Sequence, residues 1–239
     1  MAWLDKFTPD AFKYARLQRQ CRKGALPDFV CDYLGQRSTQ PGADSRWEAL
    51  RFVVLDTETT GLNPAQDRIL SIGAVAVVQG ELVLADSLEL MLQNPHTADT
   101  EAIEVHGIMP SESQSGIAEI EAVAAFLRHL RADVLVAHHT AFDAAMIEQV
   151  VRRAGAQGFA LYNHRLDTAH LAQKLEHPGK SAEYINHSQY SLDALCARYD
   201  IAMADRHTAW GDAYITGLLL MRFLRMFRSR NHLQLRSLL

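Results

Sequence analysis

The chain of 239 residues is predicted to fold as an α/β domain in which helices flank a mixed β-sheet. Two observations support this fold class. Three β-rich runs follow one another between residues 51 and 91, and the rest of the chain alternates helical patterns with two short apolar runs. The composition, 48% hydrophobic and 22% charged residues, is that of an ordinary globular domain. A short helical extension is expected to precede the sheet.

The first predicted strand, residues 51–56, is an apolar run that ends in acidic residues. Residues 69–78 and 81–91 are rich in β-branched and apolar residues, and Gly80 between them indicates a hairpin. The segments that follow alternate in type. Helices are predicted over 116–130, 141–154 and 209–227 and near 168 and 192, and strands over 133–137 and near 165.

The chain is expected to divide into a helical N-terminal extension with its linker, residues 1–46, and a main domain, residues 47–239. Helical patterns cover 9–23 and 26–34, and the linker of residues 35–45 is rich in Gln, Ser, Thr, Pro and Gly. The two helices either fold back on the main domain or form an arm that docks a protein partner. The sequence leaves both open.

The cysteines and the apolar runs bear on the cellular location. Cys21, Cys31 and Cys196 show no spacing typical of a metal or redox site, which favours a reducing compartment. The first six residues lack the apolar core of a signal peptide, and the longest apolar run, residues 213–221, is too short to span a membrane. We therefore expect a cytoplasmic protein without a membrane partner.

Two acids stand at the end of the first predicted strand. Asp56 and Glu58 follow the apolar run Phe52 to Leu55, and residues two apart in a strand share one face. Their carboxylates can therefore converge on one cation. The alternative is that they are only the solvated end of a strand.

Two further acids lie where acids are costly. Asp143 falls on the apolar stripe of its predicted helix, and Asp212 is in line with Ile215 and Leu219 on the last long helix. His207 stands five residues before Asp212. Each acid could instead only stabilise a helix N-terminus. Together, four carboxylates and one histidine favour a hard cation, Mg²⁺ or Mn²⁺, over zinc.

Three segments, taken together, resemble a known family. They are Asp56-Thr-Glu-Thr-Thr-Gly61, Ala137-His-His-Thr-Ala-Phe-Asp143 and His207-Thr-Ala-Trp-Gly-Asp-Ala213. They look like the three motifs of the DEDD superfamily of exonucleases, in its His-containing branch, which includes the proofreading epsilon subunit of DNA polymerase III, ribonuclease T and oligoribonuclease. The resemblance covers about Phe52 to Leu224 and implies a ribonuclease H-like fold.

The resemblance implies a role for each motif residue. The metal ligands would be Asp56, Glu58, Asp143 and Asp212, which would hold two Mg²⁺ or Mn²⁺ ions. His207 would take a proton from the attacking water, and Glu58 would share in catalysis.

Smaller matches extend the predicted site. His106 lies in a His-Gly-Ile segment that resembles the family's terminal-nucleotide pocket, and Thr57, Leu62 and Phe142 are further candidates for substrate binding. Ordinary packing is the alternative for these residues. Asp167, in an Asp-Thr pair that also resembles the family, is expected to cap a helix or support the metal ligands from behind.

The third motif departs from the family's pattern. Trp210 stands where small or aliphatic residues are commoner in the family. Gly211, in the first turn of the predicted helix, should weaken that turn by up to ~1 kcal/mol, so we expect His207 to be held less rigidly.

These residues predict a metal-dependent 3′–5′ exonuclease that releases nucleoside monophosphates from single-stranded or frayed 3′ ends of DNA, in proofreading or repair. One alternative is a 3′–5′ exoribonuclease that acts on short or structured RNA. The other is an inactive module that binds nucleic acid or protein. The expected partners are a nucleic-acid 3′ end and, through the N-terminal extension, a protein.

Overall fold

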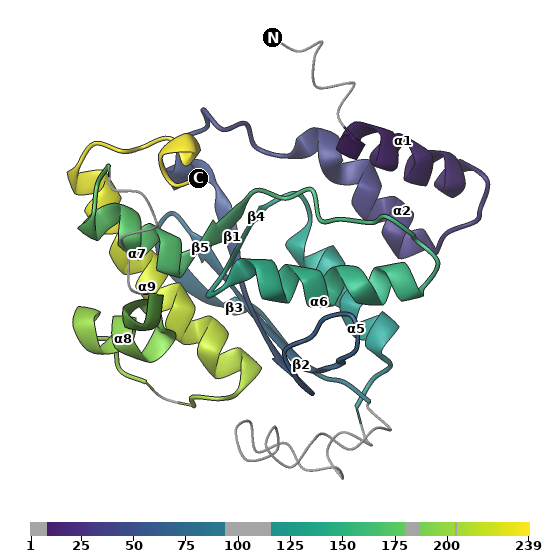
Figure 1. The fold of residues 1–239 in the computed structure, drawn as a ribbon. Helices are drawn as coiled ribbons and strands as arrows, with labels where there is room; N and C mark the ends of the chain where they lie inside the picture. The colour runs from purple at the N-terminus through teal and green to yellow at the C-terminus, as the bar shows by residue number, and fades with distance from the viewer. Residues whose placement is uncertain (1–8, 94–115, 180–186, 204) are drawn as a thin grey trace.

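The computed structural model describes residues 9–93, 116–179, 187–203 and 205–239 (Figure 1). Five strands form one mixed sheet in the order β3-β2-β1-β4-β5. β1 pairs antiparallel with β2, and β2 with β3, whereas β1 pairs parallel with β4, and β4 with β5. The predicted mixed sheet is confirmed. Its strands are β1 (Arg51–Thr59), β2 (Ile69–Val78), β3 (Glu81–Met91), β4 (Val134–Ala137) and β5 (Arg165–Asp167).

Helices cover both faces of the sheet (Figure 1). One face packs Val53 and Leu55 against α5 (Glu119–Leu130) and α6 (Thr140–Arg153). The opposite face packs its apolar side chains, Phe52 and Val54 among them, against three other helices. These are α7 (Thr168–Glu176), α8 (Leu192–Tyr199) and α9 (Ala209–Ser229).

The predicted hairpin between β2 and β3 is confirmed. Gln79 and Gly80 both have positive φ, 55° and 78°, which is the backbone of a two-residue turn whose twist matches that of the paired strands. The other predicted elements agree with the structure to within about three residues at their ends. The exception that matters is β1, which continues past Asp56 to Thr59 because β2 keeps pairing with it as far as Ile69. The acids therefore lie within a paired strand.

The N-terminal helices fold back on the main domain. They are α1 (Pro9–Arg22) and α2 (Asp28–Gly35), followed by a 3-10 turn, Gln36–Thr39. Their buried side chains, Leu17, Leu26, Val30, Tyr33 and Leu34, belong to the same core as Phe126 and Met146. The Tyr33 hydroxyl also donates a hydrogen bond of 2.5 Å to Asn163 Oδ1. Of the two arrangements that the sequence allowed for these helices, the structure shows packing against the sheet domain.

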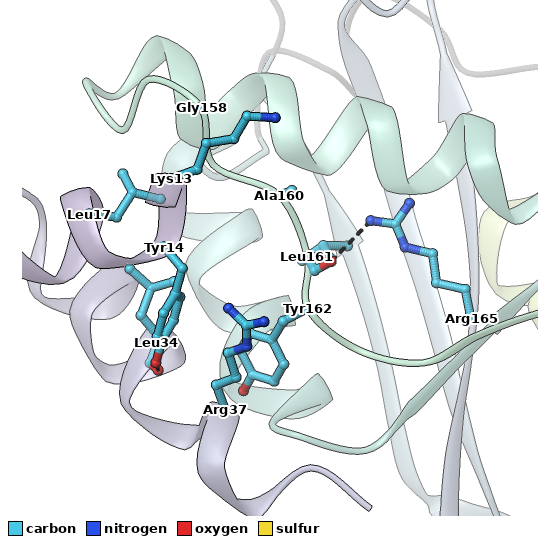
Figure 2. A pocket seen from close by; sticks show the side chains of 10 residues that line it. All are labelled: Lys13, Tyr14, Leu17, Leu34, Arg37, Gly158, Ala160, Leu161, Tyr162 and Arg165. Carbon is cyan, nitrogen blue, oxygen red and sulfur yellow. Dashed lines mark hydrogen bonds between the residues drawn. The ribbon is translucent and has the colours of Figure 1, made fainter. Parts of the chain in front are cut away.

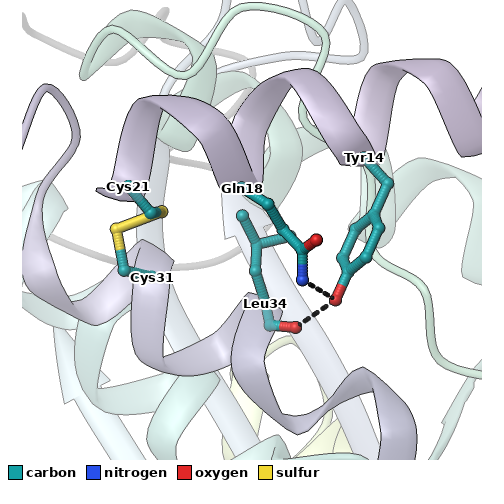
Figure 3. The surroundings of a disulfide bond; sticks show 5 residues. All are labelled: Tyr14, Gln18, Cys21, Cys31 and Leu34. Carbon is teal, nitrogen blue, oxygen red and sulfur yellow. Dashed lines mark hydrogen bonds between the residues drawn. A yellow bond between two sulfur atoms is a disulfide. The ribbon is translucent and has the colours of Figure 1, made fainter. Parts of the chain in front are cut away.

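A disulfide joins Cys21 at the end of α1 to Cys31 in α2 (Figure 3). The α1–α2 hairpin brings the two Cα atoms to 5.5 Å, a relation that the spacing of ten residues did not reveal. The spacing of the cysteines favoured a reducing compartment, and the disulfide does not support that reasoning, whereas Cys196 is buried as a thiol. Among the described residues, no helix is long and apolar enough to cross a membrane.

The first turn of α9 lies directly on β2 at Gly73. A Cβ atom at this glycine would lie 2.2 Å from the carbonyl carbon and oxygen of Ala209 and 2.3 Å from the backbone nitrogen of Trp210. Gly73 pairs with Asp56 across the sheet. The missing side chain therefore lets the start of α9 approach the strand pair that carries the acids.

Gly73→Ala should displace the start of α9, because the added methyl group meets backbone that cannot rotate away. We expect the free energy of unfolding to fall by about 1–3 kcal/mol. This loss corresponds to a decrease in melting temperature of about 3–10 °C. Gly35→Ala is the matched control, since Gly35 has a helical φ of −62° and open space around its Cβ position. Thermal melting checks this, and a Gly73→Ala protein that melts like wild type would show that the close approach is not required.

Candidate active site

Three of the predicted acids meet on the face of β1 that α9 covers. Asp56 and Glu58 continue the side of β1 that bears Phe52 and Val54, the side covered by α9. Asp212 lies in the first turn of α9 and is 7% exposed. One carboxylate oxygen from each of the three acids lies within 4.8 Å of the others. The two acids predicted to share a face of the strand therefore do so, and the third joins them from a segment more than 150 residues away.

Asp143 approaches the same strand from its other face. It lies in the first turn of α6, is 3% exposed, and accepts a hydrogen bond of 2.8 Å from the Thr57 hydroxyl. Its negative charge raises the pKa of Asp56, so the two carboxylates are electrostatic neighbours. The Thr57 side chain is thus buried against Asp143, and its predicted contact with substrate stays a prediction.

Asp167 fixes the start of two helices. Its Oδ1 accepts a hydrogen bond of 2.9 Å from the backbone nitrogen of Ala169 and caps α7. Its Oδ2 accepts one of 3.1 Å from the backbone nitrogen of Thr140, the first residue of α6. The predicted helix cap is confirmed. Because the second bond anchors the turn that carries Asp143, Asp167 also positions that carboxylate.

The loop before α9 folds tightly over the helix start. Thr208 Oγ1 accepts a hydrogen bond of 3.0 Å from the Gly211 backbone nitrogen and donates one of 2.8 Å to the Asp205 carbonyl. A Cβ atom on Gly211 would lie 2.0 Å from that same carbonyl oxygen. A side chain at residue 211 would collide with this carbonyl, so the loop requires glycine here, and the expectation about the rigidity of His207 stays a prediction. Trp210 stacks on Tyr214, with ring centres 5.5 Å apart.

His207 lies in this loop with a left-handed φ of 63°, and its side chain is exposed. No hydrogen bond joins its imidazole to any other residue that the structure describes. Its neighbour Arg206 does contact the acids. The predicted proton acceptor is therefore open to water and follows in the chain a residue that contacts the acids, and its role stays a prediction.

The predicted substrate-binding residues have different surroundings. Leu62 is 86% exposed in the β1–β2 connection, where Asp67 holds the loop by accepting hydrogen bonds from the Asn63 backbone nitrogen and the Thr60 hydroxyl. Phe142 is half-buried at the start of α6 against the core. His106 lies outside the described residues.

Burial and crowding raise the pKa values of the acids. Burial, followed by the charges of Asp143, Asp212 and Glu58, holds the pKa of Asp56 well above its usual value. Burial and the Asp212 carboxylate raise the pKa of Glu58 to about 7. Burial raises the pKa of Asp143 to about 7, opposed by the hydrogen bond from Thr57. The site therefore favours either protons or a bound cation.

Arg206 is the residue of this site that the sequence analysis missed. Its guanidinium forms ion pairs with Asp212 Oδ2 and with Asp193 of α8 at 2.8 Å, and its charge lowers the pKa values of Asp56 and Glu58. The sequence showed only that Arg206 is a basic residue beside Asp205 and His207. Basic residues of this kind are also common on solvated loops, so the pattern did not predict a role in the site.

The donor set fits a hard divalent cation. Asp212 Oδ1 is buried without a hydrogen-bond partner among the described residues, and one oxygen of the Asp212 carboxylate lies within 4.8 Å of one oxygen each of Asp56 and Glu58. Oxygen-only sets suit Mg²⁺ or Mn²⁺, whereas structural zinc prefers nitrogen and sulfur. The structure thus brings together a group of acids suited to a metal ion, and the identity of the ion belongs to the proposal below.

Acids gathered from the end of the central strand and from two helix starts form an arrangement suited to metal-assisted phosphodiester hydrolysis. Residues 53–220 match the model of the RNase T exonuclease family, and the chain belongs to that family. It is a nuclease domain of the DEDD superfamily.

Relatives with known names extend this finding. The chain is 31% identical over 202 residues to a DNA polymerase III subunit epsilon-like protein of Rhodobacter capsulatus, covering 83% of this chain and 27% of that protein. It is 29% identical over 185 residues to the PolC-type DNA polymerase III of Thermotoga petrophila, covering 77% of this chain and 13% of that protein. The chain thus spans only a small part of the relatives' length.

Among solved structures, Escherichia coli exonuclease I in complex with a dT13 oligonucleotide has a similar fold. The TM-score is 0.60 at 18% identity, over 76% of this chain and 42% of that chain. This likeness confirms the ribonuclease H-like α/β fold.

Glu58→Gln should stabilise the metal-free protein above neutral pH. A carboxyl group whose pKa is raised on folding contributes full stability below its unfolded pKa and loses that contribution as pH rises through the folded value. For Glu58 this window runs from about 4.5 to about 7. This rise in the pKa of Glu58 corresponds to roughly 3 kcal/mol of folding free energy that is lost between the two pH values.

Melting curves in chelator from pH 5 to pH 8 measure this effect. The wild type should lose melting temperature across the range, and Glu58→Gln should lose less. Glu121→Gln, at an exposed position on α5, is the control and should follow the wild type. An unchanged slope in Glu58→Gln would mean that the carboxylates are not crowded in solution.

Proposed function

We propose that this chain is a metal-dependent 3′–5′ exonuclease that releases nucleoside monophosphates from single-stranded or frayed 3′ ends of DNA, in proofreading or repair. The observation that carries the proposal is the convergence of Asp56, Glu58 and Asp212 within 4.8 Å, with Asp143 buried beside them. The names of the relatives, a polymerase subunit epsilon-like protein and an exonuclease bound to a DNA oligonucleotide, support DNA as the substrate.

The chain belongs to the His-containing branch in this proposal. Asp56, Glu58 and Asp212 would hold one Mg²⁺ or Mn²⁺ ion, and Asp56 with Asp143 would hold a second. Two such ions stabilise the attacking and the leaving oxygen of an in-line phosphodiester hydrolysis. Arg206 must leave Asp212 Oδ2 for that oxygen to serve as a ligand, and Asp193 gives its guanidinium a second partner.

The protein's own groups move the protons. The imidazole of His207 takes a proton from the water whose oxygen attacks phosphorus, and the bond from phosphorus to the O3′ of the next nucleotide breaks. A mononucleotide with a 5′-phosphate leaves, and the departing O3′ takes a proton from solvent water, so that the shortened strand ends in a 3′-hydroxyl. Histidine suits the step because it exchanges protons near neutral pH, and Glu58 would help to orient the water.

The exposed Leu62 would wedge against the terminal base, with Phe142, Thr57 and His106 completing the contact, an interaction that tolerates any base. We also propose a cytoplasmic location, where nucleic acid is available. In that reducing compartment Cys21 and Cys31 would be thiols, and α1 and α2 would be held by their apolar contacts.

Asp56→Ala should abolish degradation of end-labelled DNA without lowering the melting temperature, because Asp56 is the ligand shared by both proposed ions and its charge is repelled by its neighbours. Excess chelator should abolish the activity of the wild type. Asp200→Asn, at an exposed helix end, should retain activity. Full activity of Asp56→Ala, or of the wild type in chelator, would refute metal-assisted catalysis.

The direction of attack can be tested with blocked ends. A 3′-phosphate should slow the release of mononucleotides strongly, because it places negative charge against the acids where a hydroxyl is expected, whereas a 5′-phosphate should have no effect. The same assay on RNA separates the exoribonuclease alternative. Mononucleotides appearing first from a labelled 5′ end would contradict the proposed polarity.

His207→Ala should lower the turnover number by about 10²- to 10⁴-fold with little change in melting temperature, since a general base acts on the rate and not on packing. His207→Asn should behave similarly, and the acidic limb of the pH–rate profile should flatten in both. His170→Ala, at an exposed position on α7, is the control. Near-normal turnover with a reduced melting temperature would make His207 a structural residue.

A further inference from the structure

The outer face of α1 is basic. α1 lies at the outside of the molecule (Figure 1), and the side of the helix that bears Tyr14 and Leu17 faces the main domain (Figure 2). Leu17 is 2% exposed, whereas Phe12, Arg16 and Arg19 are all exposed. Because these three residues are spaced four and three apart in the chain, they form one stripe along the solvent side of the helix.

The positive charges of this face are not neutralised by acids. Arginines elsewhere in the domain are held by carboxylates, as Arg153 is by Glu119 and Arg198 by Glu176. By contrast, four cations at α1 have side chains that form no ion pair or hydrogen bond with any residue that the structure describes, namely Arg16, Arg19, Arg22 and Lys23. These charges are therefore available to a partner.

The excess of charge is local. Residues 9–27 contain five basic residues and one acid, although the chain as a whole has 24 basic residues against 28 acids. The nearby acids of α2, Asp28 and Asp32, are exposed and form no ion pair within the described part of the chain. A positive patch on an otherwise acidic protein attracts a negatively charged partner to that one place.

The spacing of the cations suits a linear partner. At a rise of about 1.5 Å per residue, Arg16 and Arg19 are separated by about 4.5 Å along the helix axis. Lys23, in the turn that follows the helix, lies about 6 Å beyond Arg19 if the same rise continues. A nucleic-acid strand carries its charges in a row at intervals of a few ångströms, so it can meet these cations one after another.

The face is held on a fixed backbone. Leu17 packs into the core of the main domain, and the Tyr14 hydroxyl donates a hydrogen bond of 2.6 Å to the Leu34 carbonyl (Figure 3). The disulfide between Cys21 and Cys31 ties the end of α1 to α2. Because the helix is already positioned, a strand that binds to it does not have to order the backbone, which lowers the cost of binding.

The basic face lies some distance from the acids of the candidate active site. α6 carries Asp143 in its first turn and ends at Arg153, about 15 Å further along its axis. α1 packs on the connection that follows this end, where a Cβ atom on Gly158 would lie 4.0 Å from Cγ of Lys13 (Figure 2). At about 3.4 Å per nucleotide, a strand needs about five nucleotides to cover this distance.

We propose that the outer face of α1 binds the phosphates of a single DNA strand, upstream of the 3′ end that the acids hydrolyse. This inference rests on the proposed function, and it assigns the N-terminal helices a part in holding the substrate. Arg16, Arg19 and Lys23 contact phosphates through charge-assisted hydrogen bonds. Phe12, which is 61% exposed on the same stripe, stacks on an unpaired base.

The salt dependence of binding tests the phosphate contacts. A labelled oligothymidylate of about 20 nucleotides spans both places, and its binding is measured by fluorescence anisotropy in chelator with Asp56→Ala protein. Arg16→Gln/Arg19→Gln should weaken binding about 2- to 30-fold and reduce the slope of log K against log salt by about 1.4. Arg128→Gln/Arg222→Gln removes the same charge from exposed positions on α5 and α9 and should bind as the parent does.

Phe12→Ala separates stacking from charge. It should weaken binding by about 5- to 100-fold and leave the salt slope unchanged, because no phosphate contact is lost. Leu84→Ala, at a position of β3 that is 55% exposed, is the matched control and should bind as the parent does. An oligothymidylate of three nucleotides is too short to span both places, so Phe12→Ala should not weaken its binding at the acids.

Equal affinities and equal salt slopes in Arg16→Gln/Arg19→Gln and its parent would overturn the proposal. Vesicles of phosphatidylserine and phosphatidylcholine test a membrane as the partner instead. If the double variant loses binding to these vesicles but keeps its binding to DNA, the basic face serves a lipid surface and the proposal fails.

Activity on two substrates separates this proposal from the proposed function. With Asp56 intact, Arg16→Gln/Arg19→Gln should match wild type on the p-nitrophenyl ester of thymidine 5′-monophosphate, which is too small to reach α1, and should degrade the long strand more slowly at low strand concentration. A wild type that hydrolyses neither substrate but binds the long strand through α1 would refute the proposed function and leave the basic face standing.

Discussion

The approach of the first turn of α9 to β2 at Gly73 is the contact on which the site depends. Since Gly73 has no side chain, the Ala209 backbone lies on the strand, and Asp212 reaches Asp56, the residue that pairs with Gly73. A second glycine, Gly211, lets the preceding loop fold over the same turn. Glycine therefore stands at both positions where the backbone comes close, and these two close approaches place Asp212 beside the acids of β1.

The resulting group of acids opposes folding unless positive charge offsets it. Burial and mutual repulsion raise the pKa values of Asp56, Glu58 and Asp143. Arg206 offsets part of this charge through Asp212 Oδ2, while Oδ1 of the same carboxylate is buried with no hydrogen-bond partner in the part of the chain that the structure describes. Repulsion among the acids thus weakens the fold at the place where a cation would bind, and metal binding would recover that stability.

The sequence predicted the elements well because their apolar patterns are strong, and Asp143 was found because it interrupts an apolar stripe. The extension of β1 through Glu58 was missed because acids are poor strand formers and only pairing with β2 keeps them extended.

Features that depend on segments meeting in space were also missed. The contact between Cys21 and Cys31 requires the α1–α2 hairpin, and the ion pair from Arg206 joins a loop with left-handed residues, Asp205 and His207, to the first turn of α9. The packing reason for Gly211 lies in the carbonyl of a loop residue, which no pattern in the sequence reveals.

The central claim, that the acids of β1 and α9 form a cation site, is tested most directly by a crystal structure grown with Mn²⁺ and analysed by anomalous scattering. The account predicts an anomalous peak between Asp56, Glu58 and Asp212, with carboxylate oxygens about 2 Å away and the Arg206 guanidinium moved off Asp212. A saturating Mn²⁺ concentration that gives no peak there, with Arg206 still paired to Asp212, would contradict it.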